Sequence, residues 1–131
     1  MIAVDTNVLI RLLIADDAAQ AAKARRLLDA QAEADKPIWV SDTVLVELLW
    51  TLSRAYGRTR EDLAAALRAL SRNASVAFES SEAVGAALEL FTQGGADFAD
   101  CLLCVKAANA GCDHLVTFDK STKHLPGVRV I

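Results

Sequence analysis

The chain opens with Met1-Ile-Ala-Val-Asp-Thr-Asn-Val-Leu9, and this stretch decides the fold. Its first residues are apolar and predict a short buried strand that ends at Asp5. Residues 8–13 then place apolar side chains at helical spacing, so a helix follows the strand directly. A short apolar strand that passes at once into a helix is typical of α/β proteins with a parallel sheet.

The same alternation of strands and helices continues along the chain. The strands lack clean polar alternation, which favours a parallel sheet covered by helices on both faces. We predict one α/β domain over residues 1–131, with a three-layer, Rossmann-like parallel sheet of four to five strands. Further strands are expected at residues 37–41, 75–78 and 114–119, with an edge strand at 128–131. Helices are expected from Asp16 or Asp17 to about 35, from 42 to about 57, from the capping box 59–62, and at 81–93 and 98–110.

Composition limits the functions open to this chain. With 131 residues, 53% hydrophobic and 24% charged, it has the profile of one packed domain. A net charge of −3 argues against a simple basic nucleic-acid binder, but not against a nuclease whose acids hold metal ions. The sequence has no apolar run of membrane-spanning length and no basic leader. Its three cysteines suit a reducing compartment, so we expect a cytoplasmic protein without a membrane partner.

Four carboxylates stand where their neighbours favour apolar side chains. Asp5 and Asp119 end predicted strands, whereas Glu47 and Asp100 lie in apolar helical segments. Because the carboxyl ends of parallel strands meet at one edge of a sheet, these acids are expected to form one anionic pocket. Buried like charges are costly, and a divalent cation would neutralise them. An oxygen-only ligand set favours Mg²⁺, with Mn²⁺ as a substitute.

Each acid also has a structural interpretation. Asp5 could cap the following helix, and Glu47 could face solvent because a helix needs only one apolar stripe. Asp100 could complete a capping box begun by Asp97, and Asp119 could start a turn. The conjunction of all four favours a site, while Asp97 is interpreted chiefly as a helix cap at the rim of that site.

Other polar residues are weaker candidates. Thr6, Asn7 and Thr117 flank the strand-end acids and could orient them through hydrogen bonds. Arg54 and Arg58 lie near a predicted helix end and could contact a polyanion, although a solvated basic turn is the commoner outcome. Inert or structural roles fit the cysteines and histidines better than redox or zinc chemistry does, namely Cys101, Cys104, His114 and His124.

Four short motifs together resemble the PIN domain, and more narrowly the VapC-type toxins of toxin–antitoxin pairs. They are Asp5-Thr-Asn-Val-Leu9, Glu47 within Val44–Trp50, Ala96-Asp-Phe-Ala-Asp-Cys101 and Thr117-Phe-Asp119. Each motif alone is loose, but they occur in the family's order and spacing over almost the whole chain.

The resemblance implies a Mg²⁺-dependent ribonuclease with a Rossmann-like fold. It implies that Asp5, Glu47, Asp100 and Asp119 form an acidic quartet in which Asp5 and Asp100 are the metal ligands. It also implies an RNA substrate, a homodimer and a small cognate VapB-type antitoxin. The third family acid matches Asp100 better than Asp97, and Cys101 stands where the family often has Ala.

Two other functions remain open from the sequence. A haloacid-dehalogenase-like phosphohydrolase also has an Asp at the end of its first strand, but it needs a second acid two residues later, where this chain has Asn7. A non-catalytic module of the same fold would bind a partner without cleaving RNA. A pure scaffold has no reason to keep clustered acids, which argues against this second alternative.

Overall fold

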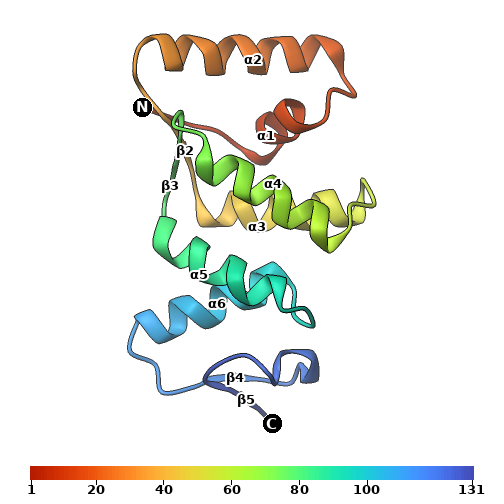
Figure 1. The fold of residues 1–131 in the computed structure, drawn as a ribbon, viewed down its shortest axis with the longest axis vertical. Coiled ribbons are helices and arrows are strands. Elements are labelled where there is room, and N and C mark those ends of the chain that lie inside the picture. The colour runs from red at the N-terminus through yellow and green to blue at the C-terminus, as the bar shows by residue number, and fades with distance from the viewer. The chain divides into compact units, whose positions relative to one another are not determined.

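The computed structural model describes residues 1–131 and divides the chain into two compact units. The first unit comprises Met1–Ser81 and the second Glu82–Ile131 (Figure 1). Both units combine helices with short strands, and every strand pair is parallel. The predicted α/β class is therefore confirmed.

The first unit contains a three-stranded sheet in the order β1-β2-β3. Its strands are β1 (Ile2–Ala3), β2 (Ile38–Val40) and β3 (Val76–Phe78). Ile38 and Val40 are almost fully buried because they lie on the central strand. The register places Ile2 opposite Ile38, and Ile38 opposite Val76.

Four helices complete the first unit, and a side chain caps the start of each. They are α1 (Thr6–Leu13), α2 (Ala18–Glu33), α3 (Asp42–Arg54) and α4 (Arg60–Arg72). The capping side chains each accept a hydrogen bond from the backbone N–H three residues ahead, which satisfies a donor that the helix itself cannot pair. These caps are Asp5, Asp17, Ser41 and Thr59. Helix α1 packs against α2 and α3, and α4 packs against α3 and β3.

The second unit is built around two helices and a two-stranded sheet. Its elements are α5 (Ser81–Thr92), α6 (Phe98–Asn109), β4 (Leu115–Thr117), the 3-10 helix η1 (Lys120–Thr122) and β5 (Val128–Val130). Strands β4 and β5 pair in parallel. The rings of Phe91 and Phe98 meet edge to face, with centroids 6.2 Å apart and planes at 89°, and this contact holds α5 against α6.

The structure differs from the prediction in the number of sheets and in the end of one helix. All five predicted strands are present, but they are divided between a three-stranded and a two-stranded sheet. Helix α3 ends at Arg54, with Ala55 as its C-cap, instead of continuing to Gly57. Gly57 has φ +62°, a backbone conformation that glycine adopts without strain, and it belongs to the turn into α4. None of the helices has the length and apolar character that crossing a membrane requires.

The capping box at the start of α4 can be tested by substitution. The Thr59 side chain accepts from the Asp62 N–H at 3.1 Å, and the Asp62 side chain accepts from the Thr59 N–H at 3.0 Å. We expect Thr59→Ala to lower the free energy of unfolding by about 1 kcal/mol, because the Asp62 N–H loses its side-chain acceptor. Urea denaturation measures this change. Thr43→Ala, at an exposed position in α3, is the control, and an equal loss in both variants would contradict the capping role.

Candidate functional site

Asp5 stands at the junction between β1 and α1. It is exposed, its backbone is extended, and its Oδ1 accepts a hydrogen bond from the Val8 N–H at 3.2 Å. The helix-cap interpretation of Asp5 is therefore confirmed. The cap uses Oδ1, so Oδ2 is left as a potential ligand oxygen, and capping does not compete with metal binding.

Glu47 lies in the middle of α3 on its exposed face. The buried stripe of this helix is made by four leucines on other positions, namely Leu45, Leu48, Leu49 and Leu52. The expectation that apolar neighbours imply a buried Glu47 is wrong, because one helix face can be apolar while the next residue points to solvent. Glu47 therefore presents an accessible carboxylate.

Asp97 and Asp100 lie at the start of α6. Asp97 is its N-cap and accepts a hydrogen bond from the Asp100 N–H at 2.9 Å, which confirms the predicted capping role of Asp97. Asp100 is half-buried, whereas the other acids of the candidate site are exposed. Burial raises the pKa of the Asp100 carboxyl to about 6, and a hydrogen bond with Asp97 and the charges of Asp97 and Asp119 add to this effect.

Asp119 follows β4 and begins η1. Its Oδ1 accepts hydrogen bonds from the Ser121 hydroxyl at 2.7 Å and the Ser121 N–H at 2.9 Å. These two bonds, that of the hydroxyl first, lower the pKa of Asp119 below its ordinary value. The predicted turn-starting role of Asp119 is thus confirmed. The pKa of Asp119 is lowered and that of Asp100 raised, so Asp119 loses its proton at a lower pH than Asp100.

The polar neighbours of the strand-end acids behave differently from one another. The Thr117 hydroxyl oxygen accepts from the Asp119 N–H at 3.0 Å, so Thr117 helps to fix the turn that carries this acid. Thr6 is only 5% exposed, and its hydroxyl has no hydrogen-bond partner. Asn7 is exposed. Of the three residues, Thr117 contacts the backbone of an acid and not its carboxylate.

The acids of the candidate site are distributed over both units. Asp5 and Glu47 belong to the first, and Asp97, Asp100 and Asp119 to the second. The structure contains no group of three or more His, Cys, Asp or Glu side chains that could hold a metal ion. The chemistry of the donors nevertheless fits Mg²⁺, because they are all carboxylate oxygens and Asp100 has two acidic neighbours whose repulsion a cation would relieve.

The predicted RNA-contact residues lie at the end of α3 and in the turn after it. The Arg54 guanidinium lies over the Trp50 ring at 6.0 Å from its centroid, a cation–π arrangement, and Arg58 is exposed. Trp50 is 61% exposed and follows Glu47 by three residues, so both share one face of α3. Trp50 was not among the site residues predicted from the sequence, although its spacing of three residues from Glu47 places both on the same helix face.

The surroundings of the thiols and imidazoles differ from one residue to the next. Cys101 and Cys104 are buried and form no disulfide, and burial raises the pKa of the Cys104 thiol. The His114 ring lies 2.8 Å from the Arg129 guanidinium, and His124 is exposed. The prediction that these cysteines are buried is confirmed.

Comparison with known proteins assigns the family. A family model described as the PIN domain matches residues 2–128. The chain belongs to the PIN domain family. This PIN domain is also similar to a VapC ribonuclease of Aquifex aeolicus (strain VF5), with 24% identity over 121 residues, which cover 92% of this chain and 89% of the relative. The resemblance stated from the sequence motifs is confirmed.

The raised pKa of Asp100 predicts how the stability of this PIN domain responds to pH. The folded protein holds the Asp100 proton more tightly than the unfolded chain, whose carboxyl has a pKa near 4. The free energy of unfolding that depends on Asp100 therefore falls as pH rises from about 4 through about 6. We expect Asp100→Asn to raise the melting temperature of the metal-free protein more at pH 7.5 than at pH 4.5.

Calorimetry at both pH values measures this difference. Asp113→Asn removes the same charge from an exposed position of the second unit and serves as the control. A change in melting temperature that is equal at the two pH values in Asp100→Asn would contradict the raised pKa.

Proposed function

We propose that this PIN domain is a Mg²⁺-dependent endoribonuclease and the toxin of a VapBC-type toxin–antitoxin pair. The observation that carries the proposal is the PIN domain match over residues 2–128, which includes all four predicted acids. The similarity to a protein named VapC ribonuclease supports RNA as the substrate. A cognate VapB-type antitoxin, a homodimer and a cytoplasmic location belong to the same proposal.

The proposed acidic quartet consists of Asp5, Glu47, Asp100 and Asp119. Asp5 and Asp100 would hold the ion: Asp5 keeps Oδ2 outside its helix cap, and Asp100 has a pKa of about 6 that a neighbouring cation would lower. When bound, Mg²⁺ would supply an activated water and stabilise the negative charge that develops on the oxygens of the scissile phosphate. Mn²⁺ could replace it.

The remaining two acids orient the attacking water and accept its proton. Asp119 Oδ1 already accepts two hydrogen bonds from Ser121, which favour its ionised form and make it a weak base. Glu47 accepts no such bond within its helix and is exposed. We therefore assign proton acceptance to Glu47 and orientation to Asp119, which Thr117 helps to hold in place.

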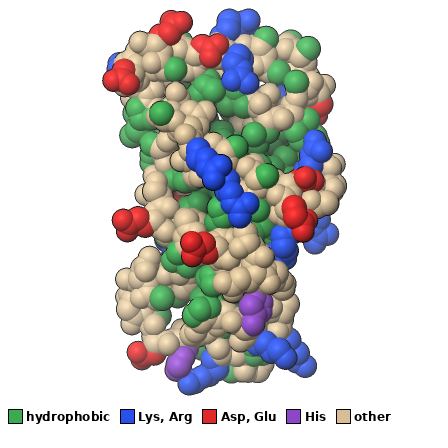
Figure 2. Space-filling model, viewed as in Figure 1, with side chains coloured by type: hydrophobic (Ala, Val, Ile, Leu, Met, Phe, Trp, Pro, Cys, Tyr) green, Lys and Arg blue, Asp and Glu red, His purple; other side chains and the backbone are tan.

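Substrate affinity has to come from local cations, because the net charge is −3. On the face shown in Figure 2, Lys and Arg side chains are interspersed with Asp and Glu and do not form one large basic patch. Arg54 over the exposed Trp50 is a local exception, since it combines a cation with an aromatic face. We assign phosphate contact to Arg54 and Arg58.

Removal of the quartet acids tests the nuclease. We expect wild-type protein to cleave a single-stranded RNA with Mg²⁺ and not with EDTA. Asp5→Asn and Glu47→Gln should each lower the cleavage rate by about 100-fold or more. Asn is as good a helix cap as Asp, so Asp5→Asn should keep the melting temperature of the metal-free protein.

Control variants distinguish the loss of a catalytic carboxylate from the general effect of removing one negative charge. Asp29→Asn on α2 and Glu61→Gln on α4 make the same changes at exposed positions outside the quartet and should keep full activity. If folded Asp5→Asn cleaves RNA as fast as wild type, the metal-ligand role is wrong. Tight RNA binding by a wild-type protein that cleaves nothing with Mg²⁺ or Mn²⁺ would instead indicate a non-catalytic PIN module.

The phosphate contact predicts a salt dependence. Arg54→Ala should weaken RNA binding at low salt and reduce the slope of log K against log[salt] by about 1, because one fewer counterion is released. Fluorescence anisotropy with a labelled RNA in Ca²⁺ measures both quantities. Arg26→Ala on α2 removes the same charge elsewhere and is the control, and identical slopes for the two variants would exclude contact through Arg54.

A further inference from the structure

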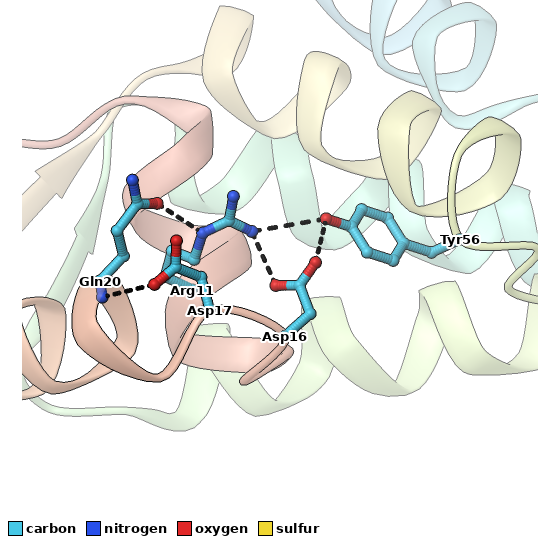
Figure 3. Close-up of polar contacts among 5 residues, drawn as sticks. All are labelled: Arg11, Asp16, Asp17, Gln20 and Tyr56. Carbon is cyan, nitrogen blue, oxygen red and sulfur yellow. Dashed lines mark hydrogen bonds and ion pairs between the residues drawn. The ribbon is translucent and has the colours of Figure 1, made fainter.

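A polar cluster joins three separate segments of the first unit (Figure 3). Arg11 belongs to the last turn of α1, Asp16 to the connection between α1 and α2, and Tyr56 to the turn after α3. The Arg11 guanidinium contacts Asp16 Oδ1 at 2.8 Å, and the Tyr56 hydroxyl donates to Asp16 Oδ2 at 3.0 Å. We call these three residues the Arg11 clamp.

Two further contacts fix the orientation of the Arg11 guanidinium. The Arg11 Nη1 atom also lies 3.5 Å from the Tyr56 hydroxyl, and its Nε donates to Gln20 Oε1 at 2.7 Å. One guanidinium thus contacts α2, the α1–α2 connection and the turn after α3 at the same time. The planar fork of Arg allows this because its N–H groups point in fixed directions, which a lysine cannot reproduce.

The Arg11 clamp connects α1, which Asp5 caps, with the end of α3, which carries Glu47. Helices α1 and α3 follow the neighbouring parallel strands β1 and β2 and pack against each other. Asp5 caps the start of α1, and Glu47 lies on α3 nine residues before Tyr56. The clamp joins the ends of these helices, whereas the strands hold their beginnings.

Both helices also bury aliphatic side chains, among them Leu9 of α1 and Leu48 of α3. The hydrophobic attraction that drives this burial has no preferred direction. A hydrogen-bonded ion pair has a defined geometry and can select one arrangement. Because α1 is only eight residues long, a shift at its end is transmitted to its start.

We propose that Arg11, Asp16 and Tyr56 are positioning residues, which fix α1 on α3 and so set the separation of the Asp5 and Glu47 carboxylates. The role in catalysis rests on the proposed ribonuclease function. The geometric role stands on the contacts of the first unit alone. An exposed ion pair contributes little to stability, so the effect of the clamp should be visible in geometry and turnover more than in the melting temperature.

Tyr56→Phe is the sharpest test because it removes only the hydroxyl. Asp16→Asn removes the charge of the bridging residue, and Asp29→Asn makes the same change at an exposed position of α2 outside the clamp. Backbone amide chemical shifts are recorded for all three proteins without metal. We expect Tyr56→Phe and Asp16→Asn to shift the amide of Val8, which donates to Asp5, and the amide of Glu47, and Asp29→Asn to leave both unchanged.

The second measurement is RNA cleavage with Mg²⁺, with kcat and KM determined separately. Tyr56→Phe should lower kcat by roughly tenfold with little change in KM, because misplaced acids slow the reaction without weakening the RNA contacts. A purely structural role would lower the folded fraction and leave kcat per folded molecule unchanged. That result, or shifts confined to residues beside the clamp, would overturn the proposal.

The two measurements distinguish failure of this proposal from failure of the proposed function. A wild-type protein that cleaves no RNA rejects the ribonuclease, yet the amide shifts of Val8 and Glu47 still decide whether the clamp sets their geometry. An active wild-type protein with unchanged kcat in Tyr56→Phe keeps the ribonuclease and rejects the clamp as a positioning device.

Discussion

The first unpaired N–H groups of a helix need acceptors, and this need governs where the acids of this PIN domain stand. Asp5, Asp97 and Asp119 each begin a helix or a 3-10 helix and accept a backbone N–H through Oδ1. The N-terminal end of a helix also favours negative charge. The fold thus stabilises these carboxylates without a metal ion, while each keeps its second oxygen for other contacts.

Most of the four acids do not bear the cost of burial that their apolar neighbours suggest. The sequence suggested that four buried carboxylates could be retained only for function, but three of the four are exposed, and two of these are helix caps. Asp100 carries an electrostatic cost, because it is half-buried beside two other acids. A cation bound beside Asp100 would lower its raised pKa and so favour its charged form.

Local sequence signals predicted most of the secondary structure. The capping box at Thr59 and Asp62 and the caps at Asp17 and Asp97 depend only on residues three or four positions apart, so they can be identified without tertiary information. The exposure of Glu47 could not be predicted in this way. Its neighbours are almost all apolar, and only the packing of α3 decides which of its faces is buried.

The sequence by itself determined the α/β class, the order of strands and helices, and the family, because hydrophobic periodicity and short motifs are properties of neighbouring residues. The tertiary structure alone decided the division of five strands into two sheets, the pKa of Asp100 and the contacts of Arg11 with Asp16 and Tyr56. Each of these depends on groups far apart in the chain. Burial, charge proximity and hydrogen-bond direction arise only when such groups are brought together in space.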